Sequence, residues 1–168
     1  PSNVGANYVI TQDNSGLVTI IPYAEGSTSF DVVYGDGSEL VNFPNGESTQ
    51  HIYTEGTYNV KIVAYNIKGE STEVTQELVV SFQAPQNLVV TIENDAVTSK
   101  MVNITATADF ATIYEFYSGE QGVEQPVATG NIGDDISYNY ETPGVYSVRV
   151  IAKGGAIETT EYTEDFEV

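Results

Sequence analysis

The sequence predicts an all-β protein made of two tandem β-sandwiches. Apolar and polar residues alternate along most segments, as in strands with one buried face, and no segment shows a helical period. The phrase HIYTEGTYNVKIVAYN at 51–66 returns in similar form as YNYETPGVYSVRVIAK at 138–153. Gly56 and Gly144, which occupy the same place in the two phrases, lie 88 residues apart. A repeat of this length is the size of one small sandwich domain rather than of a solenoid repeat.

Each copy of the repeated phrase predicts a strand with a defined inward face. In GTYNVKIVAY and GVYSVRVIAK, alternate positions are apolar or aromatic, so they belong in the two cores. The predicted core residues are Tyr58, Val60, Ile62, Tyr146, Val148 and Val150. Further segments rich in Val, Ile, Thr and Tyr predict strands at 17–21, 29–34, 73–82, 87–93, 101–108, 112–117, 137–140 and 157–168.

A domain boundary is predicted at residues 83–86, Gln-Ala-Pro-Gln. Pro85 cannot donate a hydrogen bond to a sheet, so the preceding strand should end before it. We therefore predict an immunoglobulin-like sandwich over 1–83 and a second one over 84–168. The linker is short and lacks glycine, so we expect a fairly stiff joint with limited bending.

The composition excludes several classes of partner. The net charge is −19, with −8 in residues 1–83 and −11 in residues 84–168, so both halves repel nucleic acids and anionic lipid headgroups. There is no cysteine, which excludes disulfides and thiol chemistry. No apolar run approaches the length of a membrane span. We expect the folded chain to be an acidic, soluble monomer.

The sequence gives no sign of catalysis, so we expect no enzyme. A glycosidase needs two carboxylates that flank a bound sugar, and none of the 24 acidic residues lies in a pattern that predicts such a cleft. His51 is the only histidine. Adjacent Asp134 and Asp135, with Asp109 or Glu120 as additional ligands, are weak candidates for calcium; the simpler interpretation is a solvated turn. We expect no cofactor.

The first half resembles the PKD domain, an immunoglobulin-like module of extracellular proteins. The residues that carry the resemblance are Tyr-Gly-Asp-Gly-Ser at 34–38, His-Ile-Tyr at 51–53, Gly-Thr-Tyr-Asn-Val at 56–60, and then Asn66 and Gly69. The family phrase begins Trp-Asp-Phe, and here Val32 and Val33 replace its first two residues. The second half resembles a degenerate copy, with Tyr-Glu-Phe at 114–116 in the place of Trp-Asp-Phe and 117–119 replacing Gly-Asp-Gly.

The resemblance implies structural roles for a set of turn residues. His51 should lie beside Asp36 and hold its turn, while Asp36 accepts backbone hydrogen bonds and glycines allow the tight turns. The predicted turn residues are Gly35, Asp36, Gly37, His51, Gly56 and Gly144.

In function, the resemblance implies a non-catalytic spacer that holds neighbouring domains of its parent chain away from a surface. The tyrosine-rich, lysine-poor style also resembles surface lipoproteins of Bacteroidetes that use polysaccharides, so a lipid anchor outside this chain is expected. The alternative function is direct binding of carbohydrate or protein through exposed tyrosines and loop acids, because sugar rings stack on aromatic side chains. The candidate binding residues are Tyr65 and Tyr117.

Overall fold

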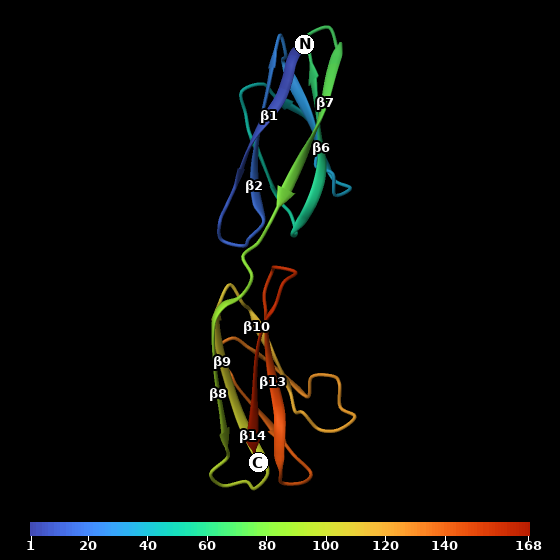
Figure 1. Cartoon of the computed structure of the whole chain (residues 1–168). Coiled ribbons are helices and arrows are strands. Elements are labelled where there is room, and N and C mark those ends of the chain that lie inside the picture. Colours follow the sequence, from blue (N-terminus) through green and yellow to red (C-terminus); the bar gives the residue numbers. More distant parts are fainter. The chain divides into compact units, whose positions relative to one another are not determined.

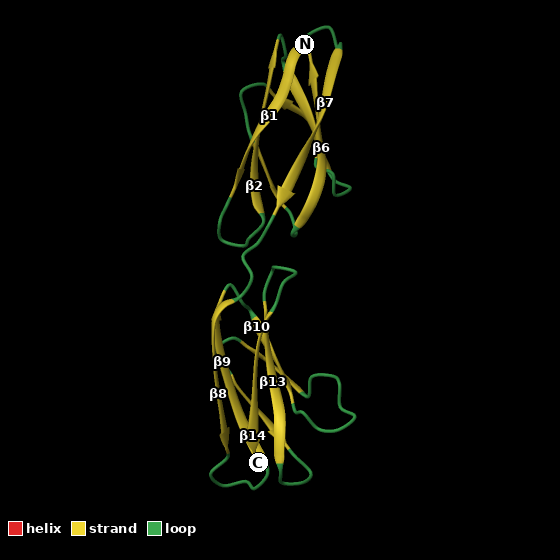
Figure 2. Cartoon of the chain, in the orientation of Figure 1, coloured by secondary structure: helices red, strands yellow, loops and turns green.

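The computed structural model describes all 168 residues and consists of strands and loops only (Figure 2). The predicted all-β class is therefore confirmed. No helix in the structure is long and apolar enough to cross a membrane. The chain divides into two compact units, Pro1–Phe82 and Gln83–Val168 (Figure 1).

Unit 1 is a seven-stranded sandwich of two antiparallel sheets. One sheet has the order β1-β2-β5 and the other has the order β4-β3-β6-β7. The strands are β1 (Ser2–Ile10), β2 (Leu17–Glu25), β3 (Ser29–Val33), β4 (Glu39–Pro44), β5 (Thr49–Ile52), β6 (Gly56–Tyr65) and β7 (Ser71–Val80).

Unit 2 repeats this topology strand for strand. Its sheets have the orders β12-β9-β8 and β11-β10-β13-β14, so each strand of unit 1 has a counterpart seven elements later. The strands are β8 (Gln86–Asn94), β9 (Met101–Asp109), β10 (Ile113–Tyr117), β11 (Ala128–Asn131), β12 (Asp135–Asn139), β13 (Val145–Lys153) and β14 (Thr160–Glu167). The three-on-four arrangement of antiparallel strands makes both units immunoglobulin-like sandwiches.

The repeat extends to an irregularity in the first strand of each unit. The pairing of β1 with β2 shifts between Ser2 and Gly5, and the pairing of β8 with β9 shifts between Gln86 and Val89. Asn3 and Asn87 lie inside these shifts with φ of 52° and 54°. Asparagine tolerates this left-handed conformation better than most residues, so the two bulges are the same feature at the same place.

Each unit has its own core between its two sheets. Val60 and Ile62 are 0% exposed in unit 1, and Val148 and Val150 are 0% exposed in unit 2. Tyr58 and Tyr146 pack against these cores but are only partly buried. The tyrosines that are almost fully buried are Tyr34, Tyr53, Tyr114 and Tyr140.

Four strands lie where the alternation of apolar residues gave no prediction: β1, β4, β5 and β11. The bulge breaks the alternation of β1, and β4 is exposed on both faces except at Phe43. β5 and β11 have four residues each, too few to show a period.

Candidate functional site

The Gly-Asp-Gly turn of unit 1 is closed by a hydrogen-bonded carboxylate. Gly35 and Gly37 have φ of 88° and 98°, a region that favours glycine. Asp36 Oδ1 accepts hydrogen bonds from the Ser38 N–H at 3.0 Å and from its hydroxyl at 2.5 Å. His51 Nε2 lies 2.6 Å from Asp36 Oδ2. The His51 hydrogen bond, followed by the Ser38 hydroxyl, lowers the pKa of Asp36 to about 2.

His51 is packed among aromatic rings as well as bonded to Asp36. Its ring stacks on Tyr34 with the centroids 3.9 Å apart, and Tyr53 meets it edge-on at 4.8 Å. The sequence predicts a structural position for His51 beside Asp36, and these contacts hold the ring against the core. No group of three or more His, Cys, Asp or Glu side chains in the chain is placed to bind a metal ion.

In unit 2 the predicted position of the Trp-Asp-Phe counterpart is wrong by two residues. In the sheets, Val32 pairs with Ile62 in unit 1 and Phe116 pairs with Val150 in unit 2. Residues 116–118 therefore correspond to 32–34, and Gly119 corresponds to Gly35. The aromatic letters of Tyr-Glu-Phe suggested the motif, but a match of letters does not fix a strand register.

Gly119 has the same structural role as Gly35. Its φ is 74°, against 88° for Gly35. A Cβ on Gly35 would lie 2.6 Å from Asn59 O, and one on Gly119 would lie 2.7 Å from the carbonyl carbon of Ser147, the counterpart of Asn59. Both turns therefore require glycine for conformation and for space.

Unit 2 also keeps the acid–ring pair with different side chains. The Tyr138 hydroxyl donates a hydrogen bond to Glu120 Oε1 at 2.5 Å, in the place of the His51–Asp36 pair. This hydrogen bond, with burial second, raises the pKa of Tyr138 to about 12. Behind each pair, a buried tyrosine donates to a carbonyl of the turn: Tyr53 to Tyr34 O and Tyr140 to Ser118 O.

Gly56 and Gly144 do not act as predicted. Neither has a positive φ, so neither is needed for a left-handed turn. Each lies beside the ring of the tyrosine two residues later, where a Cβ would be 3.5 Å from the Tyr58 hydroxyl or 3.7 Å from a Tyr146 ring carbon. These are ordinary contact distances. The sequence motif was therefore correct in marking a repeat but wrong about the role of its glycine.

The candidate calcium ligands do not converge. Asp134 and Asp135 are both exposed. Asp135 accepts a hydrogen bond from the Thr105 hydroxyl, and the carbonyl of Asp134 accepts one from Tyr114. Asp109 accepts a hydrogen bond from Asn87, while Glu120 binds Tyr138. Each carboxylate except that of Asp134 has a separate partner.

Tyr65, one of the two candidate binding residues, borders a hollow of about 510 Å³ on unit 1. Its hydroxyl donates to Asp31 Oδ2 at 2.9 Å, and Asp31 Oδ1 accepts the Asn42 N–H at 2.6 Å. The Asp31 hydrogen bond raises the pKa of Tyr65. The exposed side chains of Val41 and Ile67 complete the hollow. Its polar groups are thus largely engaged with each other.

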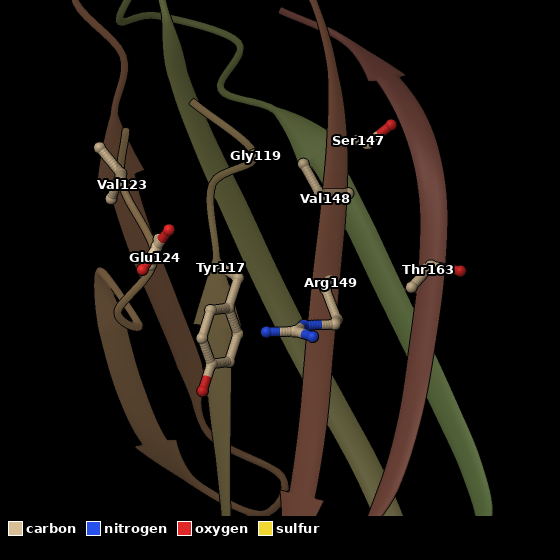
Figure 3. Close-up of a pocket in the computed structure, with 8 residues that line it drawn as sticks. All are labelled: Tyr117, Gly119, Val123, Glu124, Ser147, Val148, Arg149 and Thr163. Carbon is tan, nitrogen blue, oxygen red and sulfur yellow. The ribbon is translucent and has the colours of Figure 1, made fainter. Parts of the chain in front are cut away.

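Tyr117, the second candidate, borders a hollow of about 350 Å³ on unit 2 (Figure 3). The Arg149 guanidinium carbon lies 4.2 Å from the centre of the Tyr117 ring, and Figure 3 shows the two side chains beside each other. Val123 and Glu124 form the opposite wall. The Tyr117 hydroxyl donates to Glu115 Oε2 at 3.1 Å. Arginine therefore occupies one face of this ring.

One exposed surface was not anticipated. The outer face of the sheet β1-β2-β5 carries Val9, Ile21, Tyr23 and Ile52, all exposed. The sequence holds a signal for it, since residues 1–12 and 14–24 contain no charged side chain in an otherwise acidic chain.

No family model matches the sequence, and no curated protein matches it. Similar folds occur among solved structures, and three of them each share 13% sequence identity with this chain. The fibronectin(III)-like modules of CbhA from Clostridium thermocellum align over 98% of this chain and 93% of theirs, with a TM-score of 0.38. Beta-glucuronidase 3 of Bacteroides uniformis aligns over 97% of this chain and 25% of its own, with a TM-score of 0.37. A chimeric titin Z1Z2 tandem aligns over 96% of this chain and 97% of its own, with a TM-score of 0.31.

These scores are low, so the assignment of two immunoglobulin-like sandwiches rests on the strand order and pairing of the chain itself.

Proposed function

We propose that the chain is a non-catalytic spacer that presents neighbouring domains of a cell-surface protein. The observation that carries this proposal is the attachment of the linker to both units. In unit 1, the Phe82 N–H donates to Glu55 Oε1 at 3.1 Å, and the Phe82 ring packs against the core. In unit 2, the Thr160 hydroxyl donates to Pro85 O at 2.5 Å. Only Gln83 and Ala84 lie between these attachments, and so short a joint restricts relative motion.

The titration behaviour of the side chains supports a non-catalytic function. A general acid or base works best with a pKa near the working pH. In this chain the pKa values move away from neutral pH. Turn hydrogen bonds lower the pKa values of Asp36 and Asp95 to about 2. Burial raises the pKa values of Tyr53 and Tyr140. The hydrogen bonds of these groups serve turns and strand ends.

The parent protein is part of the same proposal. The Tyr-Gly-Asp-Gly-Ser phrase with His51 is the basis for placing unit 1 in the PKD family, with unit 2 as a divergent copy. The net charge of −19 suits a solvated surface module that does not associate with anionic partners. We place the chain outside the cell, on a Bacteroidetes outer-membrane lipoprotein of a polysaccharide-utilisation system, with the other domains of that protein as its partners.

Pairs of spin labels test the stiffness of the joint. The chain has no cysteine, so Ile67→Cys and Val97→Cys introduce one label in each unit at side chains that are 89% and 94% exposed. We expect a narrow distribution of label-to-label distances. Insertion of a Gly-Ser segment between Gln83 and Ala84 should broaden it, and Thr160→Val should broaden it less. A distribution in the unmodified chain as broad as in the insertion variant would reject the spacer.

Binding at Tyr65 or Tyr117 is the second candidate function. The two hollows favour it because each gathers a tyrosine with polar groups. Against it, the Tyr65 hydroxyl is bound to Asp31 and one face of Tyr117 is taken by Arg149. Loss of polysaccharide binding in Tyr65→Ala or Tyr117→Ala would establish this function.

A further inference from the structure

The outer face of the sheet β1-β2-β5 in unit 1 carries little charge, although the chain as a whole is strongly acidic. Among the residues of these three strands, Glu25 at the end of β2 is the only Asp, Glu, Lys or Arg. The opposite sheet of the same unit carries five such residues: Asp31, Glu39, Lys61, Glu73 and Glu77. Charge is therefore segregated between the two faces of one small sandwich.

This face exposes large side chains instead. Ile52 is 69% exposed, Val9 55%, Tyr23 47% and Ile21 39%. Ile21 and Tyr23 follow each other on the same side of β2, and Leu17, further along the same side, pairs with Ile52. Val9, in β1, pairs with Thr19, which lies on this same face of β2. The exposed groups thus form a strip along β2, the central strand of the sheet.

Tyr23 forms a platform on this strip. It pairs with Gly5 across β1 and β2, and a Cβ on Gly5 would lie 2.6 Å from Tyr23 Cζ. The ring therefore rests on the backbone of Gly5, which is buried, while almost half of the Tyr23 surface stays open to solvent. The ring is therefore supported by the protein, while its exposed part is free to stack on a ligand.

Neutral polar groups lie beside the platform. Asn7 pairs with Ile21 and has an exposed side chain that makes no hydrogen bond within the protein. Gln50 pairs with Thr19, and its Nε2 donates to Thr19 Oγ1 at 3.4 Å. Amides and hydroxyls can both donate and accept hydrogen bonds without carrying charge.

The counterpart face of unit 2 shows that the fold does not require this surface. There the sheet β12-β9-β8 exposes polar side chains that bind each other: the Ser137 hydroxyl donates to Asn103 Oδ1 at 2.8 Å, and the Thr105 hydroxyl donates to Asp135. Thr91 and Glu93 complete that polar face. Only unit 1 replaces such a network with a tyrosine and aliphatic side chains.

The dimensions of the strip limit its occupant. Nine-residue strands are about 30 Å long and neighbouring strands lie about 4.8 Å apart, so the face offers roughly 400 Å². A stable protein partner or a second copy of this chain needs about 800 Å² from each side. A peptide laid across a sheet face would leave its own N–H and C=O groups covered without enough partners. An anionic chain would be repelled by the acidic flanks.

We infer that this face binds an uncharged polysaccharide chain. A sugar ring would stack on Tyr23, its hydroxyls would hydrogen-bond the amides of Asn7 and Gln50, and its other C–H surfaces would contact Ile21 and Val9. This activity goes beyond the proposed spacer and does not depend on it, since a stiff linker and a binding face are measured separately.

Affinity electrophoresis of the full chain in gels with soluble neutral polysaccharides (glucans, mannans, xyloglucan and galactans) tests the inference, with polygalacturonate as the anionic control. We expect retardation by at least one neutral polymer and none by polygalacturonate. Tyr23→Ala should weaken binding at least tenfold, while Tyr23→Phe should stay within about threefold because stacking persists. The matched control Val79→Ala, an exposed side chain on the opposite sheet, should bind as the unmodified chain does. Loss of binding in Tyr65→Ala or Tyr117→Ala but not in Tyr23→Ala would move the site to a hollow and overturn the inference.

Gly5→Ala gives an independent test because it keeps the tyrosine but displaces its ring. The added methyl group would overlap Tyr23 Cζ at 2.6 Å, so the ring must shift from its position over Gly5. We expect weaker binding than in the unmodified chain, with both variants still showing two folded units by calorimetry. Absence of binding to every neutral polymer, binding that survives both changes, or concentration-dependent self-association lost in Tyr23→Ala would each overturn the inference.

Discussion

The hydroxyl of Tyr58 donates a hydrogen bond to the carbonyl oxygen of Thr54, four residues earlier, at 2.9 Å. Tyr146 and Thr142 repeat the arrangement in unit 2 at 2.7 Å. In both places the threonine hydroxyl also lies within 3.0 Å of the tyrosine hydroxyl. This is a tyrosine corner, in which a tyrosine near the start of a late strand ties that strand to the loop before it. The repeated Thr-x-Gly-x-Tyr phrase encodes this corner twice.

Removing the hydroxyl of Tyr58 should destabilise unit 1 alone. Tyr58→Phe keeps the ring contact with Tyr53 but loses the hydrogen bond to Thr54, which is worth about 1 kcal/mol. For a domain of this size, that corresponds to a fall of about 4–8 °C in melting temperature. Calorimetry of the full chain should show one transition lowered and the other unchanged. Tyr146→Phe should reverse the pattern, and equal shifts of both transitions would contradict separate cores.

Substitution at Gly119 tests its equivalence with Gly35. Gly35→Ala and Gly119→Ala each combine an unfavourable positive φ with a clash against backbone atoms, so each should cost more than about 2 kcal/mol. Gly37→Ala is the matched control, because its φ is also positive but its Cβ would meet nothing within 4 Å. It should cost about 1 kcal/mol. Denaturant unfolding measures the loss of stability in all three variants. A loss in Gly119→Ala as small as that in Gly37→Ala would show that Gly119 and Gly35 are not equivalent.

Much of this architecture could be predicted because buried and exposed positions of a strand alternate, and apolar and polar residues alternate with them in the sequence. The alternation in β6 and β13 identifies Val60, Ile62, Val148 and Val150, which lie at the centres of the cores. The corrected features depend on register instead. Tyr-Glu-Phe at 114–116 has the letters of the motif, yet the pairing of Phe116 with Val150 places its counterpart two residues later. Glycine identity also cannot distinguish Gly35, which needs positive φ, from Gly56, which does not.

The candidate sites were harder to predict than the fold. Parity places Tyr65 on an outer face, and Tyr117 lies at the end of a predicted strand. Neither observation can show that Asp31 binds Tyr65 and Arg149 covers Tyr117. Tyr23 lies two residues beyond the strand predicted at 17–21, so the alternation does not place it. Its support on Gly5 depends on the pairing of two strands, one of which carries a bulge that hides its period.

Calcium should have no specific effect on stability. Asp134 and Asp135 are exposed, and no three acidic or histidine side chains in the chain are placed around a common point. A specific site would stabilise the folded state by about 2.7 kcal/mol at a hundredfold excess over its Kd. We expect millimolar calcium to change the melting temperatures no more than magnesium at equal ionic strength. A larger shift with calcium, abolished by Asp134→Asn with Asp135→Asn, would identify a site.

Acid should weaken each unit through one identified carboxylate. The His51 and Ser38 hydrogen bonds lower the pKa of Asp36 from 3.8 to about 2 in unit 1. Hydrogen bonds from Asn103 and from the Thr98 and Val97 backbone lower that of Asp95 to about 2 in unit 2. Because the folded-state pKa is depressed, the stabilisation is present above about pH 4 and is lost as the pH falls toward 2.

One variant in each unit tests whether the loss of stability in acid comes from the carboxylate named for that unit. Asp36→Asn keeps an oxygen that can accept the Ser38 N–H but cannot titrate, so the unit 1 transition of this variant should start lower at pH 5 and change less between pH 4 and pH 2. Asp95→Asn should do the same for unit 2 and leave unit 1 unaffected. Asp13, whose pKa the Ser15 hydrogen bonds also lower, should leave unit 1 some residual acid dependence. If Asp36→Asn retains the full acid sensitivity of unit 1, the Asp36–His51 contact does not stabilise the turn in solution.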